Sequence, residues 1–126
     1  MSGLLLDTNV ALWLVLGDRG SVSARATEAL QDPGNEVAVS AVSVWEIAIK
    51  RSLGKLSIAD GWARELRRLT LTPMPITAEH AQQVEQLPWH HRDPFDRLLV
   101  AQAQLERRCL VTADARLADY DVEVLW

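Results

Sequence analysis

The chain of 126 residues is poor in cysteine and has no long hydrophobic run. Cys109 is the only cysteine, so the chain can form neither an intrachain disulfide nor a zinc site built from several thiolates, which agrees with a reducing compartment. The longest apolar stretch, residues 10–16, is far shorter than the roughly 20 residues that a membrane-spanning helix needs. The first residues lack the basic segment and the cleavage site of a secretory signal. We therefore expect a cytoplasmic protein that does not associate with membranes.

A Gly-rich phosphate loop and a nucleophile elbow are also missing, so P-loop enzymes and serine hydrolases have little support. Positive charge is scarce as well, with a formal net charge of -4 and an isoelectric point near 5.3. Nucleic-acid binders usually carry an excess of positive charge, so this balance at first argues against such a partner. Divalent cations held by acidic residues would weaken that argument, because the remaining Lys and Arg side chains would then act locally on phosphates.

Four acidic residues stand in apolar surroundings, where exposed chain would not place them. Carboxylates from separate apolar segments repel one another if the fold brings them together, and burial penalises each charge further unless a cation lies between them. Oxygen ligands of this kind select hard cations such as Mg²⁺ or Mn²⁺. The sequence therefore predicts a metal site formed by Asp7, Glu46, Asp96 and Asp114.

Short apolar segments alternate with segments of helical periodicity along the whole chain. This alternation predicts an α/β fold, a three-layer sandwich with a central, mainly parallel sheet flanked by helices, in a single domain over residues 1–126. We expect strands at 4–6, 37–39, 110–112 and 122–125, an extended piece at 73–75, helices at about 10–16, 23–30, 41–53, 58–71, 77–87 and 94–108, and a short helical segment at 114–117.

In such sheets, ligands bind beyond the carboxyl ends of the strands. Asp7 and Asp114 follow predicted strands, and Asp96 lies in the first turn of its helix, where backbone N–H groups stabilise a negative charge. Taken singly, each acid also has a structural interpretation, as a helix cap or, for Glu46, as an i,i+4 partner of Lys50. The metal hypothesis depends on all four together.

The predicted acids stand in four segments: LLLDTN at 4–9, SAVSVWEI at 40–47, HRDPFDRLLVAQA at 91–103 and LVTAD at 110–114. In this order they resemble the motifs of PIN-domain ribonucleases, and among these the VapC-like toxins of bacterial type II toxin–antitoxin pairs. The resemblance covers nearly the whole chain. It implies cleavage of RNA phosphodiester bonds by metal-activated water, with Mg²⁺ or Mn²⁺ held by the acidic quartet Asp7, Glu46, Asp96 and Asp114. With two ions, one activates water and the other stabilises the leaving oxygen, but a single ion is also consistent with the sequence.

The resemblance also assigns secondary roles and partners. Thr8, Ser43 and Thr112 match polar positions that orient carboxylates or water. Asp93 lies one helical turn before Asp96, and its candidate roles are a place in the same cavity and a purely structural N-cap. The implied partners are RNA as substrate, a small VapB-like antitoxin that masks the site, and a second copy of the chain in a homodimer.

Two other hypotheses compete with the nuclease. A metal-dependent phosphatase on a similar sheet would use Asp7 as a nucleophile, but that chemistry normally needs a second acid at position 9, which is Asn9. A non-catalytic binding module would use the acids only as helix caps. The neighbours His90 and His91 lack a third nitrogen or sulfur ligand for zinc, and Trp89, beside basic residues, is a weaker candidate for stacking on a base.

Overall fold

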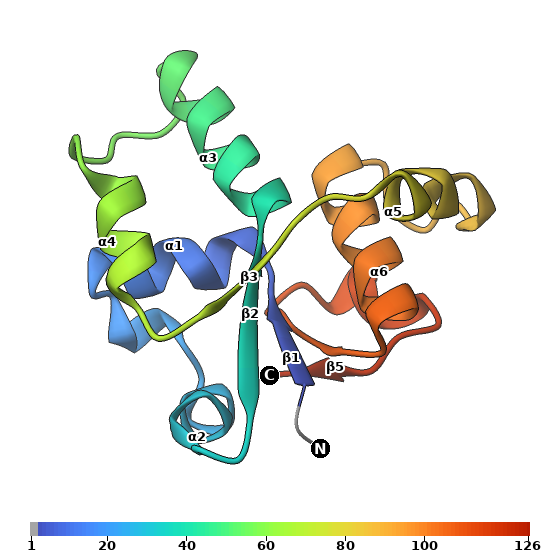
Figure 1. Cartoon of the computed structure of the whole chain (residues 1–126), viewed down its shortest axis with the longest axis horizontal. Helices are drawn as coiled ribbons and strands as arrows, with labels where there is room; N and C mark the ends of the chain where they lie inside the picture. The colour runs from blue at the N-terminus through green and yellow to red at the C-terminus, as the bar shows by residue number, and fades with distance from the viewer. Residues whose placement is uncertain (1–2) are drawn as a thin grey trace.

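The computed structural model describes residues 3–126, so residues 1–2 of the expected 1–126 domain lie outside the described residues. Strands and helices alternate along the chain (Figure 1). Their order is β1 (Gly3–Leu6), α1 (Thr8–Leu16), η1 (Arg19–Ser21), α2 (Ala24–Gln31), β2 (Glu36–Ser40), α3 (Ala41–Ser52), α4 (Trp62–Arg68), β3 (Thr72–Met74), α5 (Ala78–Gln83), η2 (Val84–Gln86), α6 (Pro94–Glu106), β4 (Cys109–Val111), η3 (Ala115–Asp119) and β5 (Val124–Leu125), where η marks a 3-10 helix.

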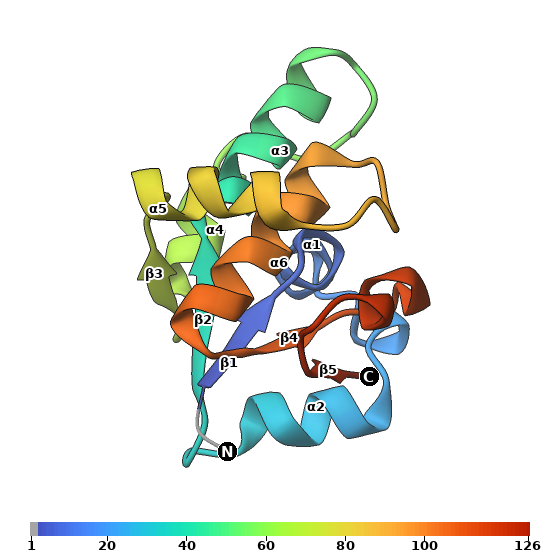
Figure 2. The ribbon, with the colours of Figure 1, turned by 90° about the vertical axis from the view of Figure 1, so that its right-hand side faces the viewer.

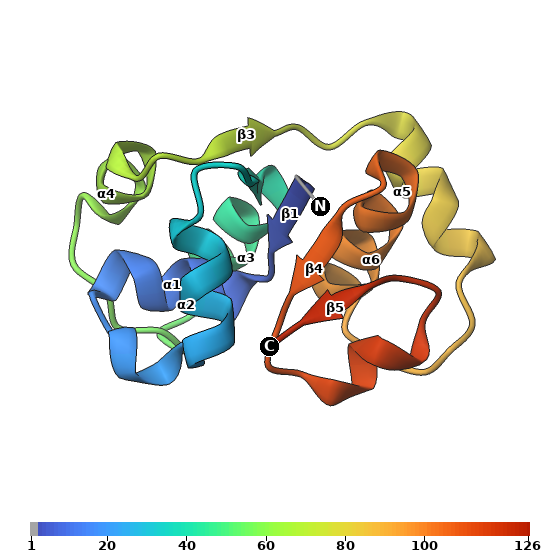
Figure 3. The same ribbon diagram turned by 90° about the horizontal axis from the view of Figure 1, so that it is seen from below.

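The described strands form one five-stranded sheet in the order β3-β2-β1-β4-β5, and every pair of neighbours is parallel. Helices α1, α2 and α4 cover one face, and α5 and α6 cover the other (Figures 1 and 3). Seen from the side of α5 and α6, these two helices lie in front of the sheet (Figure 2). The predicted α/β sandwich with a parallel central sheet is confirmed.

The apolar strands explain this layering, because their side chains point alternately to the two faces. Leu5 and Leu110 belong to the cluster that packs against α6, around Leu99. Leu4 and Leu6 belong to the cluster on the opposite face, which includes residues of α1, α2 and α4. Both faces of the sheet are therefore buried, as continuous apolar strands require.

Two predicted elements are shorter in the structure. The helix expected over 58–71 is confined to α4, because Gly61 adopts a left-handed conformation with φ +86° and begins the helix there. Arg51 binds the Ile58 carbonyl and the Asp60 carboxylate, which holds the preceding segment against α3 in a non-helical conformation. The last strand, expected over 122–125, has only the two residues of β5.

The carboxyl ends of the central strands and the amino ends of three helices meet at one edge of the sheet, the upper edge in Figure 1. At this edge β1 leads into α1 and β2 into α3, and α6 also begins there. Asp7, Ser40 and Asp93 are the N-caps of these helices, and each side chain accepts a hydrogen bond from a backbone N–H of the first turn. Among the described residues, no helix has the length and apolar character needed to cross a membrane.

Candidate metal centre

A hollow of about 200 Å³ lies at this edge of the sheet. It is built from segments that are far apart in the sequence: the start of α1, the middle of α3, the loop before α6 with its first turn, and the residues after β4. The side chains that line it are mostly charged. They belong to Asp7, Thr8, Asn9, Glu46, Lys50, His91, Asp93, Asp96, Asp114 and Arg116, so the structure brings all four predicted acids to one place.

Asp7 is fixed by the junction between strand and helix. Its N–H donates to the Val111 carbonyl at 3.0 Å, and its Oδ1 accepts the Val10 N–H at 2.8 Å. Burial raises the pKa of Asp7 above its usual value, and hydrogen bonds from Thr112 and Val10 offset this only in part. Asp7 therefore serves as a helix cap and also contributes a strongly buried carboxyl group to the hollow.

Glu46 comes from the middle of α3 and is only 5% exposed. Its Oε2 forms an ion pair with Lys50 Nζ at 2.5 Å, one helical turn further on. Its Oε1 is buried and has no hydrogen-bond partner among the residues that the structure describes. An unpaired buried carboxylate oxygen is costly, so this atom is suited to an additional ligand.

Asp96 occupies the first turn of α6, and its own N–H donates to Asp93 Oδ1 at 3.1 Å. Burial, and after it the charges of Asp93, Glu46, Asp7 and Asp114, together raise the pKa of Asp96 to about 7. Both effects are expected where carboxylates gather in a partly buried site without a cation.

Asp114 behaves in the opposite way. Hydrogen bonds from Arg116 are the main reason that the pKa of Asp114 falls to about 2. Arg116 Nε binds Oδ1 at 3.1 Å and a terminal nitrogen binds Oδ2 at 2.9 Å. Asp114 also caps η3, and its N–H donates to the hydroxyl of Thr112 at 3.0 Å. Asp114 thus remains ionised near neutral pH, whereas Asp96 is partly protonated there.

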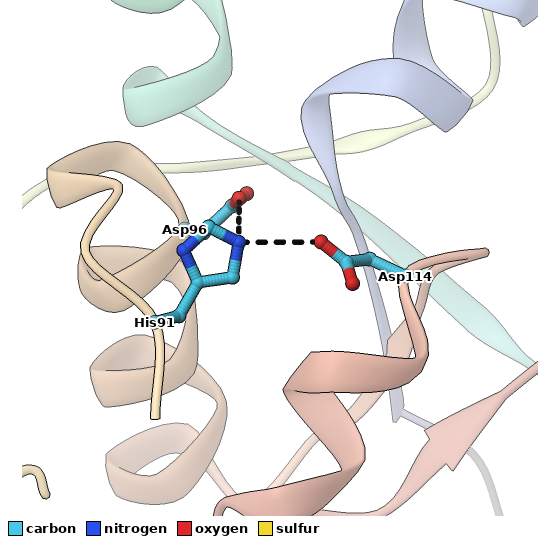
Figure 4. Close-up of side chains that lie close together, drawn as sticks. All are labelled: His91, Asp96 and Asp114. Atoms are coloured by element: carbon cyan, nitrogen blue, oxygen red, sulfur yellow. Dashed lines mark hydrogen bonds and ion pairs between the residues drawn. The ribbon is translucent and has the colours of Figure 1, made fainter. Parts of the chain in front are cut away.

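His91 lies between two of the acids, as Figure 4 shows. Its Nε2 is 3.3 Å from Asp114 Oδ2 and 3.4 Å from Asp96 Oδ2, and these three residues form a group able to hold an ion. However, His91 Nδ1 accepts the N–H of Asp93 at 3.0 Å, so the proton of the neutral ring lies on Nε2. His91 therefore donates to Asp114, and the acids remain as the candidate ligands.

The other predicted polar residues lie in the lining of the hollow or hydrogen-bond to residues that do. Thr8 Oγ1 and Ser43 Oγ are hydrogen-bonded at 3.0 Å, which ties α1 to α3 beside the hollow. Ser43 and Thr112 are buried and are absent from the lining, so they act on it through their partners: Ser43 through Thr8, and Thr112 through Asp7 and Asp114. Asp93 lies in the lining and is also the N-cap of α6, which combines its two predicted roles.

The residues present fit a divalent cation. Several carboxylates from separate segments converge, Glu46 has a free buried oxygen, and the pKa of Asp96 is raised by neighbouring charges. Hard oxygen donors in a small hollow suit Mg²⁺ or Mn²⁺, which keep several of their own water ligands.

Four residues of the lining were not predicted as site residues: Asn9, Lys50, His91 and Arg116. His91 was considered only as a zinc ligand, Lys50 only as a surface partner of Glu46, and Arg116 not at all. The i,i+4 spacing of Lys50 from Glu46 is the sequence feature from which the place of Lys50 beside the site could have been predicted. The position of His91, two residues before the α6 N-cap, shows its importance only when the loop is folded.

A buried arginine holds the loop that carries His91. Arg97 is 2% exposed, and its guanidinium donates to the carbonyls of Pro88 at 2.9 Å and Val84 at 3.1 Å. Trp89 is 74% exposed, and its ring centre lies 3.7 Å from the Arg97 guanidinium carbon. The outer face of Trp89 therefore stays open, while its inner face is stabilised by a cation–π contact.

The comparisons with known proteins agree with this architecture. Residues 4–123 match the PIN domain family. The chain belongs to the PIN-domain family. No curated protein sequence matches this PIN domain at a significant level. PIN domains are generally nucleases that use divalent metal ions.

Several solved structures share the fold of this PIN domain. VapBC2 from Rickettsia felis, bound to a promoter DNA fragment, aligns with a TM-score of 0.72 and 15% identity, covering 97% of this chain and 96% of that chain. DNA-bound VapBC from Salmonella typhimurium gives 0.65 and 15%, with coverage of 98% and 97%. VapBC-5 from Mycobacterium tuberculosis, from the VapBC family of toxin–antitoxin systems, gives 0.62 and 19%, with 98% of each chain covered. At these identities, the likeness is one of fold.

The raised pKa of Asp96 makes the stability of the metal-free PIN domain depend on pH. Between pH 3.8 and about 7 the folded state keeps a proton that the unfolded chain loses, so the free energy of unfolding falls as pH rises through this interval. We expect Asp96→Asn to flatten this decline and to raise the Tm at pH 8 by roughly 5 °C. Thermal melts in EDTA from pH 4 to 8 test this. An unchanged slope would show that Asp96 titrates normally.

Replacing Arg97 with methionine would keep the stem but leave the carbonyls of the His91 loop without donors. We expect Arg97→Met to lower the free energy of unfolding by about 3 kcal/mol, and to increase hydrogen exchange over residues 84–92. Urea melts and exchange mass spectrometry measure both effects. Arg64→Met, at an exposed arginine on α4, is the matched control and should change little. Equal stability of the two variants would contradict the assigned role.

Proposed function

We propose that this PIN domain is a Mg²⁺- or Mn²⁺-dependent endoribonuclease and the toxin of a type II toxin–antitoxin pair. The observation that carries the proposal is the convergence of Asp7, Glu46, Asp96 and Asp114 on one hollow at the carboxyl edge of the sheet. The binding-module hypothesis accounts for the capping roles of Asp7 and Asp114. It does not account for Glu46, which lies in mid-helix with a buried unpaired oxygen.

We assign Asp7 and Asp96 as direct metal ligands, with Glu46 and Asp114 completing the coordination directly or through water. Asp7 and Asp96 are the two acids whose pKa is raised, so they gain most from a bound cation. A bound ion of this type would supply Lewis acidity towards a phosphate oxygen and would lower the pKa of water.

The protein's own residues orient the acids. Val10 N–H fixes Asp7, and Asp93 fixes the first turn of α6 and so the backbone of Asp96. His91 Nε2–H donates to the carboxylate of Asp114 and lies 3.4 Å from Asp96 Oδ2, so the ring holds the two acids close together. Since these contacts exist before any ligand arrives, the carboxylates need little rearrangement to receive a cation.

The proposed partners are an antitoxin and a second copy of the chain, and the proposed compartment is the cytoplasm, where the RNA substrate lies. The VapBC structures with the same fold support the antitoxin. The chain also exposes apolar surface on α3, at Val44 and Trp45, beside a second hollow of about 500 Å³ with mainly apolar walls that include Leu66 and Met74. By contrast, most apolar residues of the segment 10–16 pack into the core, as do Leu66, Leu69 and Leu71.

The nuclease is tested with purified protein on total cellular RNA. We expect discrete fragments with Mg²⁺ or Mn²⁺ and none with EDTA. Asp7→Asn keeps the size of the side chain and the N-cap oxygen but removes the charge, so it should reduce cleavage at least a hundredfold without loss of fold. The decisive readout is the fragment pattern on a gel, with the fold checked by circular dichroism.

The identically purified Asp7→Asn protein also controls for contaminating nuclease. If wild type and variant cleaved alike, after removal of any antitoxin and with metal binding verified, the nuclease proposal would be wrong. The same samples test metal binding itself, since a bound ion raises the Tm by mass action and a capping-only protein would show no such rise.

The homodimer predicts a definite solution mass. Light scattering after size exclusion at micromolar concentration should give about twice the chain mass of 14.0 kDa. Trp45→Glu, which places a charge on the exposed apolar face of α3, should shift the protein towards the monomer. A wild-type monomer at this concentration would count against the dimer.

A further inference from the structure

Two basic side chains lie in the wall of the acidic hollow and come from different elements. Lys50 lies on α3, and Arg116 lies in η3, after β4. Lys50 Nζ pairs with Glu46 Oε2 at 2.5 Å, and Arg116 binds both oxygens of Asp114. Arg116 therefore occupies both oxygens of Asp114 and Lys50 occupies one oxygen of Glu46, so each basic group competes with a metal ion for the negative charge of its carboxylate.

The two acids are held in place, whereas their basic partners are exposed. The side chain of Glu46 is 6% exposed and that of Asp114 is 26% exposed, against 43% for Lys50 and 66% for Arg116. Within the described residues, these carboxylates are the only hydrogen-bond partners of both basic groups. If the carboxylates were bound to a metal, Lys50 and Arg116 would remain at the rim without partners.

The net charge of the lining indicates which ligand Lys50 and Arg116 would bind once they were released from the carboxylates. Its lining carries the carboxyl groups of Asp7, Glu46, Asp93, Asp96 and Asp114 against only two basic side chains, an excess of three negative charges when all are ionised. A phosphodiester cannot enter such a site favourably. Two divalent ions would leave the lining with one net positive charge, and the freed basic groups would then be the nearest donors for backbone phosphates.

We propose that Lys50 and Arg116 exchange partners: they hold Glu46 and Asp114 in the metal-free protein and bind RNA backbone phosphates on either side of the scissile bond once a divalent ion has taken the carboxylates. The unpaired Oε1 of buried Glu46 is independent evidence that the carboxylate set is incomplete without an additional ligand. This proposal rests on the proposed nuclease function and adds a consequence: metal binding and RNA binding strengthen each other.

The exchange predicts effects of opposite sign on the two ligands. Lys50→Met and Arg116→Met each remove a charge that competes with the metal, so Mn²⁺ should bind severalfold more tightly in the absence of RNA. The same variants should bind a short fluorescent RNA of mixed sequence severalfold more weakly when Mn²⁺ is present. Each should also reduce the slope of log affinity against log salt by about one, because one phosphate contact is lost.

Calorimetry with Mn²⁺ alone and fluorescence anisotropy with the RNA, checked on a gel for intactness, provide these readouts without relying on turnover. Lys55→Met and Arg64→Met remove the same charges from exposed positions outside the hollow and should change neither affinity appreciably. Lys50→Arg keeps the charge and should retain most of the RNA affinity. Because Lys50 and Arg116 are exposed, their variants should fold, and thermal melts verify this.

The possible outcomes separate this proposal from the nuclease itself. Tighter Mn²⁺ binding together with weaker RNA binding supports the exchange. Weaker Mn²⁺ binding in both variants would mean that Lys50 and Arg116 only position Glu46 and Asp114, and would overturn it. Wild-type cleavage with unchanged RNA affinity in the variants would also overturn the exchange but leave the nuclease intact. A wild type that neither cleaves RNA nor binds it more tightly with Mn²⁺ would refute both.

Discussion

Repulsion between carboxylates in a small, partly buried hollow is the constraint on which the rest of this structure depends. Without a cation, three features lower this repulsion: Asp96 is partly protonated near neutral pH, Asp114 is paired with Arg116, and Glu46 is paired with Lys50. Each feature lowers the repulsion at a different acid. None satisfies all the oxygens, because Glu46 Oε1 remains buried without a partner among the described residues. The site is therefore stable enough to fold and still favours a ligand.

The fold provides the geometry that makes this gathering possible. Parallel strands end at one edge, and the helices that follow begin there, so the capping side chains of α1 and α6 face the same hollow as the acids. Helix N-termini at this edge also provide positive potential, which partly offsets the negative charge. Capping and metal binding are thus not competing explanations for Asp7, since the cap uses Oδ1 of a side chain that also lines the hollow.

The sequence was sufficient to predict the sheet, its layers and the convergence of the four acids. These depend on local apolar runs and on the rule that parallel strands end together. It was not sufficient for His91, because a histidine in a loop acquires its role only when Arg97 folds that loop against α6 and Asp93 N–H fixes the ring. The length of α4 was also missed, since it depends on the contacts of Arg51 with residues 58 and 60, which no periodicity reveals.

The acidic composition of the whole chain at first argued against a nucleic-acid partner. The assembled site removes this argument, because part of the negative charge is gathered where metal ions would neutralise it. Five of the 17 acidic residues lie in the lining of one hollow, where carboxylates are required for binding hard cations. A substrate that carries phosphates is repelled from this hollow until cations are present, so net charge alone does not decide whether such a protein binds RNA. What decides it is the local balance between carboxylates, bound cations and the few basic groups within reach, here Lys50 and Arg116.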